Sequence, residues 1–246
     1  MRALLLGFTL LAATPALAAE KYVGSNVDVR TVLAFKVADA AVQKFLPEGW
    51  QPDVATAGPA KDVNLRVTFI DRIVNQDAEG KALEPVRIAH LSIPAKKKGS
   101  ETGGTMLFRI YSSSAGGVPG PYGVSVHAPA NMERKIRIDP AGTGTVEEAW
   151  EFKSQDGDSI QLQIQYARGA STPDKAETKF YSAAKPEFYR IYRSEQSTDV
   201  VAADRVQKIL FKASGPTLSP LFDGSEQLIG VTSDPWYTRQ TFLPAS

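Results

Sequence analysis

Hydrophobic and polar side chains alternate along much of this chain. Between residues 65 and 69, Leu, Val and Phe alternate with Arg and Thr, and the same spacing recurs at 106–110 and at 160–166. A period of two places one face of a strand against a core and the other face in water, which is typical of antiparallel sheet. The pattern therefore predicts a mainly β protein.

One hairpin is marked by its turn residues. Asp156-Gly157 lies between the apolar positions that end at Phe152 and the alternating segment that begins near residue 160. An Asp-Gly pair between two such segments indicates a tight β turn. Because alternate side chains share a face, we expect Trp150, Phe152 and Tyr166 to pack in one core across this hairpin.

Helix and loop signals complete the predicted layout. A short helix is predicted over residues 37–46, and Pro47 ends it. Segments rich in Gly, Pro and Ser predict loops at 55–61, 75–81, 95–104, 112–121 and 170–177. We find no internal repeat and no linker, and a β barrel of 200–250 residues commonly forms one unit. The prediction is a single domain over residues 22–244.

The first 18 residues have the three parts of a secretory signal peptide. Arg2 precedes an apolar run over residues 3–13, and Ala16-Leu17-Ala18 matches the small-x-small cleavage rule. The apolar run is shorter than the about 20 residues that a membrane span requires. We therefore expect export to the periplasm or the medium, with cleavage after Ala18 and no membrane span.

Composition narrows the chemistry. The chain has no cysteine, so disulfides and thiolate chemistry are excluded. Its 28 Lys and Arg residues nearly balance 27 Asp and Glu residues, which gives no reason to expect nucleic acid as a partner. Glycine-rich phosphate-binding motifs are absent, and neither His90 nor His127 has a carboxylate at ligand spacing, so no cofactor and no metal are predicted.

The densest group of charges lies at residues 131–139. In a strand, Glu133, Lys135 and Arg137 share one face, and Arg134 lies on the other. This pattern is typical of an exposed edge strand with mixed charge. It also permits chemistry, because a lysine crowded by cations loses its proton more easily and its free amine attacks a ketone to form an imine.

Three stretches resemble the acetoacetate decarboxylase superfamily. They are residues 32–37 with Leu46-Pro47-Glu48-Gly49, residues 84–94 ending in Ala89-His90-Leu91-Ser92-Ile93-Pro94, and residues 211–242. Their order and spacing carry the likeness. The resemblance implies an antiparallel β barrel or cone with flanking strands, a few short helices and a buried apolar cavity. It also implies decarboxylation through a lysine imine.

The resemblance suggests the site residues as well. The family's Gly-Tyr-Pro-Lys-Lys signature matches residues 131–135, where Glu133 replaces the proline and Arg134 replaces the first lysine. An arginine cannot form an imine, so the catalytic set becomes Lys135, Arg134 and Glu133. Glu84 and Arg87 lie near the place of the family's central-strand carboxylate. With His127, which leads into the charged segment, they form the predicted ligand-binding set.

Three hypotheses follow. The first is a lyase that acts on a keto acid or related carbonyl compound through Lys135. The second is a non-catalytic binder of a small apolar or carboxylated ligand, with Arg134 or Lys135 as an anion anchor. The third is a structural or interaction protein of the cell envelope. A small-molecule ligand is the expected partner under the first two, and a homo-oligomer is compatible with all three.

Overall fold

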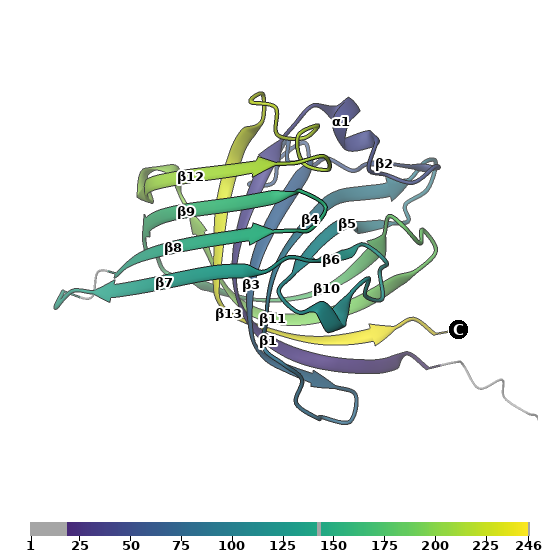
Figure 1. Ribbon diagram of the computed structural model, residues 1–246, viewed down its shortest axis with the longest axis horizontal. Helices are drawn as coiled ribbons and strands as arrows, with labels where there is room; N and C mark the ends of the chain where they lie inside the picture. Colours follow the sequence, from purple (N-terminus) through teal and green to yellow (C-terminus); the bar gives the residue numbers. More distant parts are fainter. Residues whose placement is uncertain (1–18, 142–143, 246) are drawn as a thin grey trace, which may run out of the picture.

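The computed structural model describes residues 19–141 and 144–245, and most of them lie in strands (Figure 1). The predicted signal peptide lies outside the described residues. The elements in chain order are β1 (Lys21–Lys36), α1 (Asp39–Gln43), β2 (Trp50–Pro52), β3 (Leu65–Asp77), β4 (Val86–Lys97), β5 (Gly103–Ser112), β6 (Ser125–His127), β7 (Ala130–Ile138), β8 (Gly144–Lys153), β9 (Ser159–Ala167), β10 (Thr172–Ser182), β11 (Tyr189–Val201), β12 (Val206–Ser214) and β13 (Gln227–Leu243), with short 3-10 turns at Ala115–Gly117 and Ala203–Arg205.

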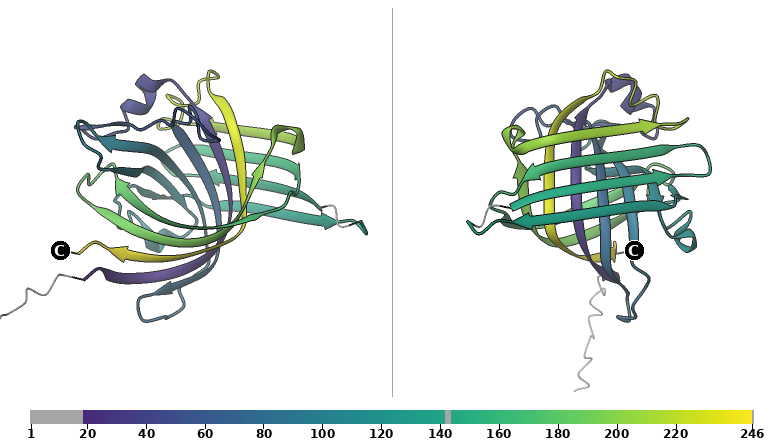
Figure 2. Two further views of the ribbon diagram at one scale, coloured as in Figure 1. Left: turned by 180° about the vertical axis from the view of Figure 1, so that it is seen from behind. Right: turned by 60° about the vertical axis from the view of Figure 1, so that its left-hand side comes forward.

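The larger sheet closes on itself. Its hydrogen-bonded order is β2-β4-β3-β1-β13-β11-β10-β5-β6, and β4 also pairs with β5. That second pairing joins β4, β3, β1, β13, β11, β10 and β5 into a ring, to which β2 and β6 are attached. Figure 2 shows the long, bent strands of this barrel from two sides. The expected β barrel or cone is therefore present.

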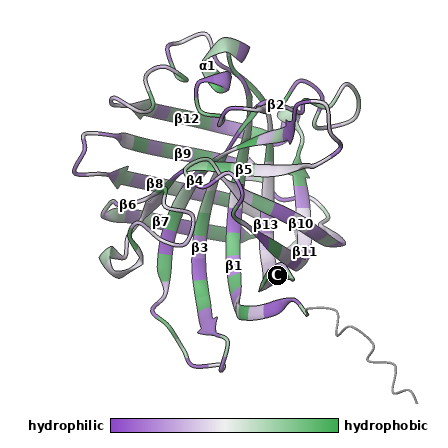
Figure 3. Ribbon diagram, turned by 90° about the vertical axis from the view of Figure 1, so that its right-hand side faces the viewer, coloured by the Kyte–Doolittle hydropathy of each residue, from purple (hydrophilic) through white to green (hydrophobic). Residues whose placement is uncertain are grey.

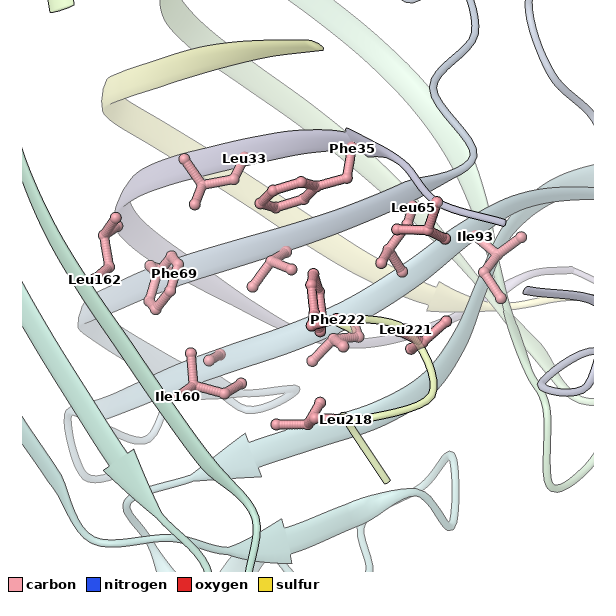
Figure 4. Packing of buried hydrophobic residues seen from close by; sticks show 14 of the residues in the cluster. Leu33, Phe35, Leu65, Phe69, Ile93, Ile160, Leu162, Leu218, Leu221 and Phe222 are labelled. Carbon is pink, nitrogen blue, oxygen red and sulfur yellow. The ribbon is translucent and has the colours of Figure 1, made fainter. Parts of the chain in front are cut away.

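A separate four-stranded sheet covers one side of the barrel. Its order is β12-β9-β8-β7, all antiparallel, and it forms a distinct layer in Figure 1. The main hydrophobic core lies between this sheet and the barrel wall. Figure 4 shows Leu33, Phe35 and Phe69 of the barrel wall near Ile160 and Leu162 of the covering sheet.

The barrel strands place core side chains on their outer face and charged side chains on their inner face. On β1, Leu33 and Phe35 face outward into the core beneath the covering sheet, whereas Asp28 and Arg30 face the barrel interior. The same alternation appears along β3 and β4, and Figure 3 shows apolar and polar segments alternating along β1 and β3. The face that forms the main core therefore packs outside the barrel, and the face that carries the charged side chains lines its interior.

Strand β1 needs a glycine where it passes close to β3. Its register against β13 on the other side shifts between Tyr22 and Gly24, and Gly24 has a φ of 150°. A Cβ placed on Gly24 would lie 2.3 Å from the backbone oxygen of Gln76. A bulge of this kind bends a strand and increases its twist, which helps a sheet to close.

Several predicted boundaries differ from the structure. Helix α1 spans only Asp39–Gln43, because the chain turns before Pro47. The loop predicted at 170–177 is largely strand β10, which pairs with β11 despite its polar sequence. Strand β5 runs parallel to both β10 and β6, so the barrel is mostly rather than wholly antiparallel. The pairing of β5 with β10 joins segments distant in sequence, which local patterns do not reveal.

The Asp156-Gly157 hairpin is confirmed, since β8 and β9 pair from Lys153 and Ser159 onward. Trp150, Phe152 and Tyr166 are all buried in the main core, as expected.

Replacing Trp150 by Ala should lower the free energy of unfolding by about 3–5 kcal/mol, because a large cavity forms in packed surroundings. Chemical denaturation measures this. Trp236→Ala is the control: Trp236 is 44% exposed, so its replacement should cost less than about 1 kcal/mol. Equal losses in the two variants would contradict the packing described.

Candidate functional site

The barrel interior contains a partly open cavity of about 410 Å³. All seven strands of the ring contribute side chains to its wall, and Ser114 and Tyr122 from the β5–β6 connection complete it. Binding sites for small molecules commonly have volumes of about 300–1,000 Å³. The interior is therefore large enough for a small ligand.

Two arginines in the cavity share one buried carboxylate. Arg30 Nη2 lies 2.6 Å from Asp28 Oδ2, and Arg72 Nε lies 3.1 Å from Asp28 Oδ1. The Asp28 side chain has no exposed surface. Burial raises the pKa of Asp28, but the charges of Arg72, Arg30 and Arg239 outweigh burial, and the net effect lowers it. Asp28 is therefore ionised, and it orients both guanidinium groups.

Two further arginines lie against tyrosine rings. Arg239 Cζ is 3.9 Å from the centre of the Tyr192 ring, and Arg190 Cζ is 6.0 Å from the centre of the Tyr122 ring. Tyr122 donates a hydrogen bond of 2.7 Å to the Tyr192 hydroxyl. The Nε atoms of Arg190 and Arg239 are buried and have no hydrogen-bond partner among the described residues. Both arginines therefore retain donors for a ligand.

Positive charge dominates the interior. Four arginines line the cavity, and Glu84 is its only lining carboxylate among the described residues and is exposed at the rim. Asp234 is buried nearby, and burial raises its pKa, although a hydrogen bond from Thr198 and the charge of Arg30 oppose the shift. Even with Asp28 and Asp234 both ionised, the arginines outnumber these buried carboxylates. The electrostatics favour an anion.

His90 faces the same interior from β4. Burial lowers the pKa of His90 to about 3, and the charges of Arg30, Arg239 and Arg72 act in the same direction. Its Nδ1 is buried without a hydrogen-bond partner in the described part of the chain. His90 is thus a neutral imidazole at physiological pH, able to accept or donate one hydrogen bond.

Much of the remaining wall is apolar. Ile70, Ile88, Leu107, Ile110 and Phe180 lie beside the charged groups. Guanidinium groups bind carboxylates through paired hydrogen bonds, while aliphatic and aromatic side chains cover hydrocarbon. The cavity therefore suits a small molecule with both an anionic and an apolar part.

Lys135 lies elsewhere. It is on β7 in the covering sheet, where its Nζ contacts Glu133 Oε1 at 2.9 Å, and its side chain is 53% exposed. The two residues line a shallow hollow of about 160 Å³ on the covering sheet, together with Gln163 and Lys208. The burial on which the imine hypothesis depends is not found there.

Arg134 points the opposite way, into the contact between sheet and barrel. Its Nε lies 3.3 Å from Glu148 Oε1, and its Nη1 lies 3.5 Å from Asp71 Oδ2. Arg87 also contacts Asp71, at 3.1 Å. The structure thus brings together Arg134 and Arg87, but at the interface between the layers and not in the cavity.

Of the six predicted site residues, Glu84 alone lines the barrel cavity. His127 is half-buried at the end of β6 and does not line it. The sequence analysis did not select Asp28 or the four cavity arginines. A signal was present, because charged residues at alternate positions of β1 repeat the pattern of a solvent-facing strand. Only closure of the sheet shows that this face is interior.

Neither a protein-family model nor a curated protein matches the sequence. Solved structures do match. MppR, an enduracididine biosynthesis enzyme, has a TM-score of 0.53 and 12% identity in its complex with pyruvate, over 98% of this chain and 96% of that one. An acetoacetate decarboxylase-like enzyme from Sphingomonas wittichii RW1 has a TM-score of 0.52 and 11% identity, over 98% of both chains. At this identity the likeness shows the fold, and this chain has the acetoacetate decarboxylase-like fold that its sequence resembles.

Two other features were sought in the described residues. They contain no group of three or more His, Cys, Asp or Glu side chains arranged to hold a metal ion. No helix among them has the length and apolar character required to cross a bilayer.

The different surroundings of Arg134 and Lys135 can be tested by replacing each residue and measuring the free energy of unfolding. Arg134→Ala should lower the free energy of unfolding by about 3 kcal/mol, because the buried Glu148 loses its cation. Lys135→Ala should change it by less than about 0.5 kcal/mol, because the Lys135–Glu133 pair is exposed. Urea denaturation of both variants measures this. A larger loss for Lys135→Ala than for Arg134→Ala would contradict the placement of both residues.

His90 should make the protein sensitive to acid. Its pKa falls from 6.5 to about 3 on folding, so the unfolded chain binds the extra proton between these values. The free energy of unfolding therefore has its full value, as far as His90 is concerned, above pH 6.5. It decreases as the pH falls toward 3, by up to about 1.4 kcal/mol per pH unit.

Denaturation of wild-type protein and His90→Gln between pH 7 and 4.5 measures this difference. The variant should show the shallower loss, because contributions from Asp28 are common to both proteins. Identical slopes would show that His90 is not held neutral.

Proposed function

We propose that this protein binds a small carboxylate-bearing molecule in the barrel cavity. The observation that carries the proposal is the set of four arginines around a partly open, partly apolar cavity, because two of these arginines have unpartnered buried Nε atoms. Buried cations favour a counter-ion, and a guanidinium pairs well with a carboxylate. A structural neighbour with the same fold, MppR, has been solved with pyruvate, which supports a carboxylate as the ligand class.

A second candidate is the lyase reaction through Lys135, which the enzyme neighbours favour. In that reaction the amine would condense with a ketone and release water, and a β-carboxylate would leave as carbon dioxide. We rank it below binding, because the described residues that line the cavity include no lysine and Lys135 lies in the shallow hollow outside it.

We also propose that residues 1–18 direct export and are removed after Ala18. The basic start, the short apolar run and Ala16-Leu17-Ala18 support this. N-terminal sequencing of protein recovered from the periplasm or medium tests it. A first residue of Ala19 is expected, whereas a chain that begins at Met1 would contradict cleavage.

Calorimetric titration with pyruvate, acetoacetate and hexanoate tests the binding function. Wild-type protein should bind at least one of them, and Arg239→Gln should weaken that affinity about tenfold or more, because a charged hydrogen bond contributes about 1.5–3 kcal/mol. Arg193→Gln is the matched control, since Arg193 pairs with Glu177 and Glu20 away from the cavity. Its affinity should equal that of the wild type.

Borohydride treatment with the same keto acids separates the two candidates. Binding without covalent trapping and without carbon dioxide release supports the binder. Trapping that Lys135→Arg abolishes would establish the lyase instead. Absence of binding by every carboxylate tested would overturn the proposed function.

A further inference from the structure

The cavity arginines divide into a paired and an unpaired set. Asp28 binds Arg30 and Arg72 at 2.6 and 3.1 Å. Arg190 and Arg239 form no ion pair with any described carboxylate, and their buried Nε atoms have no hydrogen-bond partner there. Neither of these two charges therefore has a described carboxylate in direct contact.

These two arginines arise from separate places on the wall. Arg190 lies on β11, and Arg239 lies on β13 directly opposite Ser194 of β11. Four residues along a strand span about 13 Å, so the backbones of the two arginines are far apart. Tyr192, which pairs with Thr241, lies between them on β11, and its hydroxyl joins Tyr122. The two guanidinium groups thus lie against different rings of one tyrosine pair.

The number of unpaired charges restricts the ligand. A molecule with one carboxylate brings one negative charge to two guanidinium groups that have no ion-pair partner, and it therefore leaves a net positive charge in a poorly solvated site. A molecule with two carboxylates can satisfy both. Leu107, Ile110 and Phe180 line the same cavity, and such side chains favour hydrocarbon between the two charged ends.

We propose that the cavity is a dicarboxylate site, in which Arg190 and Arg239 each bind one carboxylate of a molecule with a short apolar linker. The proposal rests on the proposed carboxylate-binding function and adds the charge and shape of the ligand. A phosphate monoester would suit a different kind of site, because both of its negative charges lie on one group that could bind at a single place on the wall.

The test compares probes that differ by one charge. Glutarate, adipate and suberate are titrated into the full-length mature protein beside their monoamides, which have nearly the same size and one carboxylate, at constant ionic strength. Propyl phosphate is the single-group dianion. The best dicarboxylate should bind at least tenfold more tightly than its monoamide, and affinity should pass through a maximum with linker length.

Arg190→Gln and Arg239→Gln should each reduce the preference for the dicarboxylate over its monoamide to threefold or less. The matched control is Arg193→Gln, on β11 but paired with Glu177 outside the cavity, and it should keep the wild-type preference. The comparison in wild-type protein needs no variant, so it decides the matter even if a substitution prevents folding.

The outcomes separate the two proposals. Equal affinities for dicarboxylate and monoamide would overturn the dicarboxylate site while leaving the carboxylate-binding function intact. Tighter binding of propyl phosphate than of every dicarboxylate would replace the two-point site by a single anion site. No binding of any probe, pyruvate and hexanoate included, would overturn the binding function itself.

Discussion

The carboxylate of Asp28 offsets part of the positive charge in the barrel interior. Four guanidinium groups in one cavity repel one another, and removing them from water costs free energy. Asp28 contacts two of them, and Arg30 also stacks over the Tyr237 ring at 3.2 Å. Asp28 and Arg72 are register partners on the neighbouring strands β1 and β3, so the orientation of the charged wall depends on this one carboxylate. The unpaired arginines remain available because Asp28 can satisfy only its immediate neighbours.

The interface between barrel and covering sheet relies on a second buried carboxylate. Glu148 of β8 accepts hydrogen bonds from Thr31 of β1 and from Trp150, and Arg134 of β7 contacts it from the edge. This network fixes the covering sheet over the apolar face of the barrel wall. The charged segment at 131–139 therefore contributes Arg134 to the assembly of the two layers, while Lys135 and Glu133 face outward.

Local sequence predicted the fold better than the site, for a physical reason. Alternation is a property of one strand, so the hairpin at Asp156-Gly157 and the buried Trp150 followed directly from the sequence. The resemblance supplied the barrel. Whether a polar face of a strand points to solvent or to an interior, however, depends on how the whole sheet closes. Asp28 and Arg30 have the spacing of solvent-facing residues, and only the pairing of β4 with β5 turns them inward. The crowding of charge around Lys135 was compatible with an exposed edge strand and with imine chemistry, and β7 is the edge strand of the outer sheet.

The strands that bound the cavity carry their packing and their chemistry on opposite faces. Leu33 and Phe35 pack β1 against the covering sheet, and Asp28 and Arg30 of the same strand face the barrel interior. An exchange of one cavity side chain for another therefore leaves the main core untouched. In evolutionary terms, such a scaffold can trade one ligand for another without first losing its stability, which gives a mechanical reason why a single fold comes to host unrelated activities.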